Sequence, residues 1–386
     1  MRDRGSDSEG TWAIIAGGGT AGHVLPGVSI AAEVVRRGTP RRAVHFVGSS
    51  RGVETRLVPE AGFGLTTLPG RGLQRRLTLA NAAAAAALAR AFVQALAVVR
   101  RRKPAVVVGL GGYASAACAA AAVLLRVPLV ITEQNAVPGL ANRLLGRFAS
   151  GVATAFDATE LPGATWTGNP VRTEVLAADR VGGRSGARAA LGVGAERRMV
   201  AVFGGSLGAR RINEAVLDAM GRWRTREDLH VRHITGRRDH AEMSRQAVGE
   251  GGSAVHDLVE YEDDMAAVYA AADLVVSRSG ATTVAELAAV GVPAVLVPLP
   301  GAPGDHQSAN ARRLADTGAA VVVPDAELDG SRLALEVDTL LADPDRLAAM
   351  ASAARGLARS DAAAAVVDLI ENCARRPRPD PARAAP

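Results

Sequence analysis

Four glycine-rich turns contain the residues best suited to chemistry. Each follows an apolar run and precedes a helical pattern, in WAIIAGGGTAGH (12–23), VVVGLGGYAS (106–115), VAVFGGSLGAR (200–210) and LVVSRSGATTVAEL (274–287). Glycine lets the backbone approach an anion closely, and the following helix presents free N–H groups and about half a positive charge. Four such turns, two in each half of the chain, predict binding of phosphates or diphosphates.

Two side chains beside these turns are candidates for direct roles. His23 stands at a helix start, which disfavours the charged imidazolium and leaves a neutral ring able to accept a proton. Glu286 stands one turn into a helix, where a carboxylate can hold ribose hydroxyls. The alternatives are an incidental role for His23 and, for Glu286, a capping box with Thr283 in which the glutamate reaches back to the backbone.

The first turn also fits the GxGxxG of dinucleotide-binding folds, through Gly17, Gly19 and Gly22. That motif expects an acid about 20 residues later, at the end of the second strand. Here FVGSS is followed by Arg51, and Glu54 lies several residues into the next segment. The missing acid argues against a dehydrogenase, although an arginine at this place suits the 2′-phosphate of a cofactor.

No metal site is expected. His230 and His233 are three apart on a predicted strand and so face opposite sides. The acids of DPD (343–345) and of YEDDM (261–265) stand where helices begin, which is typical of caps. Without a metal, helix N-termini, backbone amides and arginines would have to meet the charge of a leaving diphosphate.

Composition narrows the class of protein. The chain has 386 residues, a formal charge of +6 and 45 basic residues, of which Lys103 is the single lysine. That surplus suits nucleotides, diphosphates or acidic lipid, whereas 3% aromatic residues are too few for the stacking platforms of nucleic-acid binders. Cys118 and Cys373 form no CxxC, and the longest apolar runs are interrupted by charge or proline. We therefore expect a soluble protein of a reducing cytosol, without an export signal.

Apolar runs alternate with alanine-rich helical stretches, which predicts an α/β protein with two parallel sheets. In the first half we expect helices near 24–37, 77–102, 114–125 and 138–148 and strands near 12–16, 43–48, 63–68, 105–109, 128–132 and 151–155. In the second half we expect strands near 199–203, 229–234, 254–259, 273–277, 294–298 and 319–323. Two Rossmann-like domains of this kind would face a central cleft and bind two substrates at their strand ends.

The segment RGLQRRLTL (71–79) places arginines beside leucines. Such a mixture suits docking on an anionic membrane face. The alternative is a solvated loop whose leucines point inward.

The turns, taken together and in order, resemble the MurG-type N-acetylglucosaminyltransferases of bacterial peptidoglycan synthesis. The resemblance spans about residues 12 to 370. Besides the first, second and fourth turns it includes EQNAVPGLANR (133–143), GNPVR (168–172), FGGSLGARRIN (203–213), DDMAAVYAAAD (263–273) and DHQSANA (305–311). Departures are Glu262, where the family usually has an apolar residue, and Thr132, where a histidine is common.

The resemblance implies a GT-B fold, no cofactor and a metal-independent, inverting hexosyltransferase. Such enzymes move N-acetylglucosamine from UDP-N-acetylglucosamine to the muramoyl 4-hydroxyl of lipid I, giving lipid II. By this resemblance the donor is bound by Thr20, Ala21, Gly22, Asn135, Arg172, Ser206, Glu262, Ala281, Thr282, Glu286 and Gln307. The acceptor diphosphate is expected near Gly18, Gly19, Gly111, Gly112 and Tyr113, with His23 as the catalytic base.

The implied organisation has disordered tails over 1–10 and 375–386 and a linker over 173–186. The acceptor and membrane-docking domain takes 11–172, and the UDP-N-acetylglucosamine domain takes 187–374, with a last helix able to pack back on the first domain. The implied location is the cytoplasmic face of the cell membrane, as a peripheral protein of a cell-wall synthesis complex. Alternatives are a nucleotide-sugar 2-epimerase, an NADP-linked oxidoreductase and a non-catalytic UDP-sugar sensor.

Overall fold

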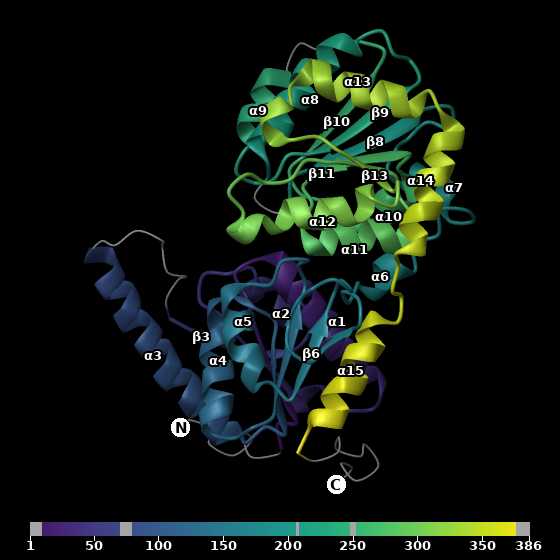
Figure 1. Ribbon diagram of the computed structural model, residues 1–386. Helices are drawn as coiled ribbons and strands as arrows, with labels where there is room; N and C mark the ends of the chain where they lie inside the picture. The colour runs from purple at the N-terminus through teal and green to yellow at the C-terminus, as the bar shows by residue number, and fades with distance from the viewer. Residues whose placement is uncertain (1–9, 70–78, 206–207, 248–251, 376–386) are drawn as a thin grey trace, which may run out of the picture. The chain divides into compact units, whose positions relative to one another are not determined.

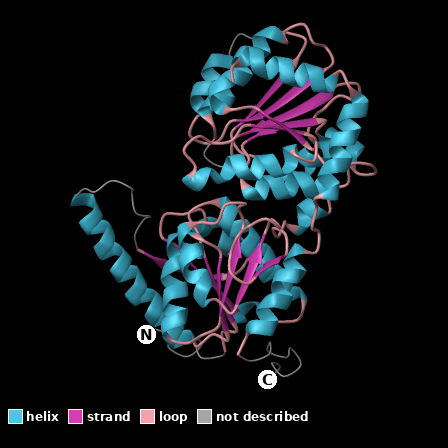
Figure 2. Cartoon of the chain, in the orientation of Figure 1, coloured by secondary structure: helices cyan, strands magenta, loops and turns pink. Residues whose placement is uncertain are grey.

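The computed structural model describes residues 10–69, 79–205, 208–247 and 252–375. The chain divides into two compact units, Met1–Arg172 with Arg359–Pro386, and Thr173–Ala358. Each unit is built on a parallel sheet with helices on both of its faces (Figure 1, Figure 2). The two sheets predicted from the alternating pattern are therefore present.

The sheet of the first unit has seven parallel strands in the order β3-β2-β1-β4-β5-β6-β7. They are β1 (Ala13–Ala16), β2 (Val44–Ser49), β3 (Gly64–Leu68), β4 (Val106–Gly109), β5 (Leu129–Glu133), β6 (Gly151–Thr154) and β7 (Ala164–Trp166). The order reverses between β1 and β4, where ligands of open α/β sheets bind at the carboxyl ends of the strands.

Apolar side chains cover both faces of this sheet. On β1, Ala13 and Ile15 belong to one buried cluster, and Ile14 and Ala16 to the other, as strand alternation requires. The helices are α1 (Ala21–Arg36), α2 (Glu54–Glu60), α3 (Leu79–Arg102), α4 (Gly112–Leu124), α5 (Leu140–Leu145) and α15 (Ala362–Cys373), with 3₁₀ turns η1 (Arg41–Ala43) and η2 (Gly146–Phe148). The clusters place α1 and α15 on one face and α3 and α4 on the other.

The second sheet has six parallel strands in the order β10-β9-β8-β11-β12-β13. They are β8 (Arg198–Phe203), β9 (Leu229–Ile234), β10 (Val255–Val259), β11 (Leu274–Ser277), β12 (Ala294–Leu296) and β13 (Ala320–Val322). Its switch point lies between β8 and β11, the strands that precede the third and fourth glycine turns.

One face of this sheet is buried in a cluster that includes Trp223, Ile212 and Leu333. The helices of the second unit are α6 (Thr173–Leu176), α7 (Arg184–Ala190), α8 (Arg210–Arg222), α9 (His240–Ala247), α10 (Met265–Ala271), α11 (Ala281–Val290), α12 (His306–Ala315), α13 (Gly330–Leu341) and α14 (Pro344–Gly356), with 3₁₀ turns η3 (Pro303–Asp305) and η4 (Asp325–Glu327). The α8 and α13 pair covers one face.

Most elements follow the predicted pattern, and two details differ. Every predicted strand is present, and β7 is an additional strand at the sheet edge. The segment expected as a linker contains α6 and the start of α7, and it groups with the second unit. Helix α15 groups with the first unit, where it packs against α1 through Arg37, which pairs with Asp368 at 2.6 Å.

Two predicted caps are confirmed. The Asp264 carboxylate accepts a hydrogen bond from the Ala267 amide at 3.0 Å, and Asp343 accepts one from the Arg346 amide at 2.9 Å. These carboxylates therefore begin α10 and α14. Among the helices that can be described, none combines the length and the apolar character needed to cross a bilayer.

A stacked histidine pair lies beside β9 and β10. The ring centroids of His233 and His256 are 5.5 Å apart and the ring planes are nearly parallel, and the His233 Nε2 lies 3.0 Å from Asn213 Oδ1. Burial lowers the pKa of His233 to about 3, with His256 and His240 adding repulsion. Burial also lowers the pKa of His256 to about 4, against the opposing effect of Asp257.

These shifts predict that the fold weakens in mild acid. An unfolded histidine, with a pKa near 6.5, binds a proton that the folded rings exclude, so their stabilisation is complete above that pH. It is lost as pH falls from about 6.5 towards 4, by up to about 1.4 kcal/mol per pH unit for each ring. Melting temperatures measured between pH 7.5 and 5 should fall, and His256→Phe should flatten that fall. An unchanged slope in the variant would contradict this assignment.

Candidate functional site

The first glycine turn joins β1 to α1. Thr20 is the N-cap residue of α1, Ala21 and Gly22 begin the helix, and His23 follows in its first turn. The Thr20 hydroxyl lies 3.2 Å from His23 Nδ1. When Nδ1 carries the proton and donates to Thr20, Nε2 is the basic nitrogen of the ring.

A buried carboxylate holds this turn in place. Glu54, at the start of α2 and 1% exposed, accepts hydrogen bonds from the Gly19 amide at 2.9 Å and from the Ser49 amide at 2.5 Å. A Cβ atom on Gly18 would lie 2.0 Å from Glu54 Oε1, so the turn is glycine-rich partly because this carboxylate fills the space. The sequence pattern gave no sign of this contact, because Glu54 is 35 residues from Gly19.

The second turn joins β4 to α4 and lies against the first. A Cβ atom on Gly112, whose φ is +81°, would lie 2.8 Å from the Gly18 carbonyl oxygen, and one on Gly111 would lie 3.1 Å from His23 Nε2. The Gly111 amide donates to Ser115 Oγ at 3.2 Å. The structure thus brings together His23 and four of the five residues predicted for the acceptor diphosphate.

Tyr113, the fifth of these residues, uses its hydroxyl elsewhere. The hydroxyl oxygen lies 2.8 Å from the Pro69 carbonyl oxygen and 3.0 Å from that of Ala87, and its single proton is available to either acceptor. Burial raises the pKa of Tyr113. The side chain therefore ties α4 to the end of β3 and to α3, and only the Tyr113 backbone remains at the helix start.

A second buried carboxylate organises the loop after β5. Glu133 is 3% exposed and accepts hydrogen bonds from the Asn135 amide at 3.0 Å, the Gly139 amide at 3.0 Å and Asn142 Nδ2 at 2.8 Å. Asn135, which is predicted to bind the donor substrate, therefore lies in a loop fixed by Glu133. The GNPVR segment that ends at Arg172 follows β7, at the end of the first unit.

The third turn follows β8 in the second unit. Ser206, a predicted diphosphate ligand, lies outside the described residues. The loop after β9 contains the fully buried Asp239, which accepts hydrogen bonds from Arg238 at 2.9 Å and from Asn213 at 3.3 Å. The hydrogen bond from Arg238 holds the pKa of Asp239 below its usual range.

The fourth turn follows β11 and begins α11. Gly280 is the N-cap residue. Ala281 and Thr282, which are both predicted to bind the donor substrate, form the first turn, with their amides at the helix N-terminus. Glu286 is 4% exposed, and its Oε2 accepts a hydrogen bond from the Tyr269 hydroxyl at 2.9 Å. The capping-box alternative is wrong, because α11 begins before Thr283 and that residue is not the N-cap.

Gln307 and Glu262 are the remaining residues predicted to bind the donor substrate. Gln307 lies in the first turn of α12, and its Oε1 accepts a hydrogen bond from the Leu299 amide at 3.0 Å. Glu262, which departs from the family pattern, pairs with Arg232 at 2.5 Å and accepts a hydrogen bond from the Asp264 amide at 3.0 Å. The unusual carboxylate is therefore compensated by an arginine on β9.

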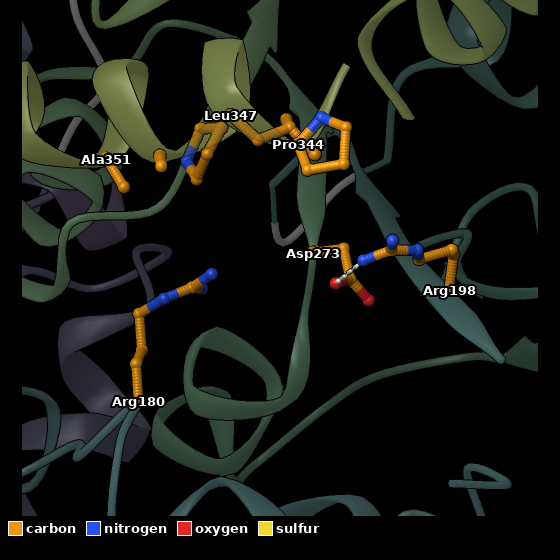
Figure 3. Close-up of a pocket in the computed structure, with 8 residues that line it drawn as sticks. Arg180, Arg198, Asp273, Pro344, Leu347 and Ala351 are labelled. Carbon is orange, nitrogen blue, oxygen red and sulfur yellow. Dashed lines mark ion pairs between the residues drawn. The ribbon is translucent and has the colours of Figure 1, made fainter. Parts of the chain in front are cut away.

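A cavity of about 160 Å³ lies at the opposite, amino-terminal edge of this sheet, lined by Arg180, Arg198, Asp273, Pro293, Pro344, Leu347, Ala348 and Ala351. Figure 3 shows Arg198 directed at Asp273, with which it forms an ion pair at 3.5 Å. Burial lowers the pKa of Arg180 to about 10. The cavity contains none of the predicted site residues, and its arginines have structural partners.

A metal centre is not indicated by the side chains that can be described. In those parts of the chain, no three histidine, cysteine, aspartate or glutamate residues are grouped so that they could hold an ion. The predicted site residues instead lie at helix N-termini and in turns after parallel strands.

Comparisons with known proteins identify the family. Residues 13–154 match the glycosyltransferase family 28 N-terminal domain, and residues 199–368 match its C-terminal domain. A relative from Alkalilimnicola ehrlichii is 47% identical over 359 residues, covering 92% of this chain and 97% of the relative. The chain belongs to glycosyltransferase family 28. The Alkalilimnicola relative is named UDP-N-acetylglucosamine–N-acetylmuramyl-(pentapeptide) pyrophosphoryl-undecaprenol N-acetylglucosamine transferase.

Solved structures agree with this family 28 membership. The crystal structure of Acinetobacter baumannii MurG has a TM-score of 0.73 and 30% identity, covering 94% of this chain and 99% of that one. A UDP-GlcNAc 2-epimerase from Neisseria meningitidis has a TM-score of 0.63 over 92% of this chain and 98% of its own, at 13% identity. The second likeness shows a shared fold alone. The predicted fold class, two Rossmann-like parallel sheets of the GT-B kind, is confirmed.

The Glu54 contact generates a prediction. Glu54→Gln leaves one acceptor oxygen for two amides and turns an NH₂ group towards a donor, so the variant should lose about 1–3 kcal/mol of unfolding free energy. Turnover should fall as well, because the Gly19 turn loosens. Glu60→Gln on the same helix, where Glu60 pairs with Arg56 on the surface, should cost no more than about 0.5 kcal/mol in the same urea titrations. Equal losses in the two variants would contradict the anchoring role.

Proposed function

We propose that this chain transfers N-acetylglucosamine from UDP-N-acetylglucosamine to the muramoyl 4-hydroxyl of lipid I, forming lipid II in peptidoglycan synthesis. The observation that carries the proposal is the 47% identity to a transferase of that name across 92% of the chain. The substrates are UDP-N-acetylglucosamine and lipid I, and the product is a disaccharide on an undecaprenyl diphosphate.

The second unit binds the donor in this proposal. The amides of Ala281 and Thr282, together with Ser206, hold the diphosphate, since a helix N-terminus favours an anion. Glu286 holds the ribose, the Glu262 backbone lies against the uracil, and Gln307 contacts the sugar. The buried position of Glu286 and the fixed side chain of Gln307 support these roles.

The first unit contributes the acceptor site and several donor contacts. The acceptor diphosphate is proposed to bind at the strand ends that carry Gly18, Gly19, Gly111, Gly112 and Tyr113. The donor is proposed to contact Thr20, Ala21, Gly22, Asn135 and Arg172. The contact between the two glycine turns, with Gly112 against the Gly18 carbonyl, supports one shared anion site.

The reaction is a single displacement with His23 as the base. The muramoyl 4-oxygen attacks the anomeric carbon, its proton passes to His23 Nε2, and the bond to the β-phosphate oxygen breaks with its electron pair leaving on UDP. Inversion follows from attack opposite the leaving group. The Thr20 contact with Nδ1 supports this role, because a proton on Nδ1 that is donated to Thr20 leaves Nε2 as the basic atom.

Helix N-termini and arginines are proposed to stabilise the leaving diphosphate without a metal. UDP release should therefore continue in excess EDTA, should require a lipid I analogue and should accompany a disaccharide product. Release without acceptor would favour a hydrolase or an epimerase, and UDP binding without any release would favour a sensor. Each of those outcomes would contradict the proposed transfer.

The base assignment predicts that His23→Asn lowers kcat by about 10²- to 10⁴-fold, the usual contribution of general-base catalysis. UDP affinity, measured by calorimetry, should stay within about twofold, because the imidazole acts on the acceptor. His45→Asn is the matched control. His45 is a buried histidine of the same unit that bonds Thr66, so its loss should lower stability without a comparable loss of kcat. A loss in His23→Asn below about tenfold would contradict the assignment.

We also propose that the first unit docks on the anionic cytoplasmic face of the cell membrane. The segment 71–79, expected to do this, lies outside the described residues. A surface on α5 and η2 supports docking. It carries three apolar residues spaced four apart, Leu140, Leu144 and Phe148, which are 72%, 55% and 64% exposed. The exposed Arg143 and Arg147 lie between them in the sequence. Exposed apolar groups beside arginines suit an acidic lipid surface.

This surface gives a prediction for vesicle binding. Each basic residue near anionic lipid contributes about 1 kcal/mol, so reversing both charges, Arg143→Glu with Arg147→Glu, should weaken sedimentation with phosphatidylglycerol vesicles by more than about tenfold. Leu144→Ser with Phe148→Ser should weaken it at high salt too. The control pair, Leu335→Ser with Arg346→Glu, changes an exposed leucine and an exposed arginine of the second unit and should not alter sedimentation. Equal binding by all variants would exclude docking through α5.

A further inference from the structure

A buried hydroxyl contacts the proposed ribose ligand from a neighbouring helix. Tyr269 lies on α10 and is 1% exposed, and its hydroxyl donates to Glu286 Oε2, on α11, at 2.9 Å. Both partners are out of water, where a hydrogen bond to a charged group is stronger than on the surface. The Tyr269 hydroxyl therefore has a direct influence on how the Glu286 carboxylate is oriented.

Helix α10 is itself held firmly at both ends. Asp264 caps its first turn. At its last turn Arg180 donates to the Tyr269 carbonyl oxygen at 2.9 Å, Arg188 to that of Ala271 at 3.5 Å, and Arg184 to that of Ala272 at 3.2 Å. These arginines stand four residues apart, and Arg180 and Arg184 lie in the segment that the sequence suggested was a linker.

The charge of these arginines is partly neutralised next to α10. Asp273, just after the helix, pairs with Arg184 at 2.8 Å and with Arg188 at 3.4 Å, and its other partner Arg198 is visible in Figure 3. Cations at a helix C-terminus are also stabilised by the helix dipole. The arrangement fixes the position of the Tyr269 backbone.

The Tyr269 ring is fixed as well. It meets the Phe203 ring edge to face, with centroids 6.2 Å apart and planes at 68°. Phe203 is the last residue of β8, directly before the third glycine turn. The ring therefore contacts the end of the strand that precedes the third glycine turn, and its hydroxyl contacts Glu286 on α11.

We propose that Tyr269 is a positioning residue for ribose recognition. Its hydroxyl sets the rotamer of Glu286, and the oriented carboxylate accepts hydrogen bonds from the vicinal hydroxyls of a ribonucleoside diphosphate. The Tyr269–Glu286 pair thus makes the donor site selective for ribose over sugars that lack those hydroxyls. This inference rests on the proposed donor role of Glu286.

The test compares the affinities of UDP and 2′,3′-dideoxy-UDP by calorimetry. A site built to bond hydroxyls rejects an analogue without them, so the unaltered protein should prefer UDP by at least about a hundredfold. Tyr269→Phe keeps the ring and its contact with Phe203 and removes the donor. This variant should lower the ratio of UDP affinity to dideoxy-UDP affinity by about tenfold, almost wholly because UDP binds more weakly.

Kinetics and a double variant separate positioning from packing. With Tyr269→Phe the KM for UDP-N-acetylglucosamine should rise about tenfold while kcat changes less than about threefold. In a Glu286→Gln background the further change Tyr269→Phe should have little effect, because the two residues act as one unit. Arg180→Gln, which removes the hydrogen bond to the Tyr269 carbonyl and spares the ring, should narrow the preference by a smaller factor.

Trp223→Phe is the matched control. The Trp223 indole is a buried aromatic donor to a carboxylate, Asp338, at 3.0 Å in the same unit. Its loss should lower the melting temperature and leave the ribose preference unchanged. If Tyr269→Phe weakened UDP and its dideoxy analogue equally, Tyr269 would be a packing residue and the inference would be overturned, with the transferase activity still standing. If the unaltered protein showed no preference, the ribose role of Glu286 itself would fail.

Discussion

Buried carboxylates at the ends of parallel strands are the interaction on which the rest of this molecule depends. Parallel strands deliver several loops to one edge, and each loop arrives with backbone amides that have no strand partner. Glu54 and Glu133 lie among such loops, 1% and 3% exposed, and each accepts at least two main-chain amides. A buried charge is costly unless it is bonded in this way, so each carboxylate and its loop fix one another.

The second unit uses the same chemistry with different partners. Asp239 is satisfied by Arg238, Arg210 and Asn213, and Glu286 receives a tyrosine hydroxyl. Main-chain amides contribute to holding both carboxylates of the first unit, whereas the partners named for these two are side chains. The geometry of Asp239 and Glu286 therefore depends on how α8, α9 and α10 pack.

Local sequence patterns were sufficient to predict the strands of the two sheets, but they did not reveal the contacts of the buried carboxylates. Apolar runs and glycine turns predicted every strand of the two sheets except β7, whose three exposed residues are too few to form an apolar run. Asp264 and Asp343 were predicted as caps because a cap is made within four residues. Glu54 reaches Gly19 across 35 residues, and Tyr269 reaches Glu286 from another helix, so no local spacing reveals them. The capping box failed because its letters fit α11, but the helix begins at Ala281.

The internal hydrogen bonds also limit what the first unit can offer to an anion. The amides of Gly19 and Gly111 already donate to Glu54 and Ser115, although both residues lie at the predicted diphosphate positions. The amides of Gly112 and Tyr113 open α4, where the first turn of a helix has no internal acceptor. An acceptor diphosphate at this edge would therefore be bound at the N-terminus of α4, with the bonded glycines fixing the shape of the site.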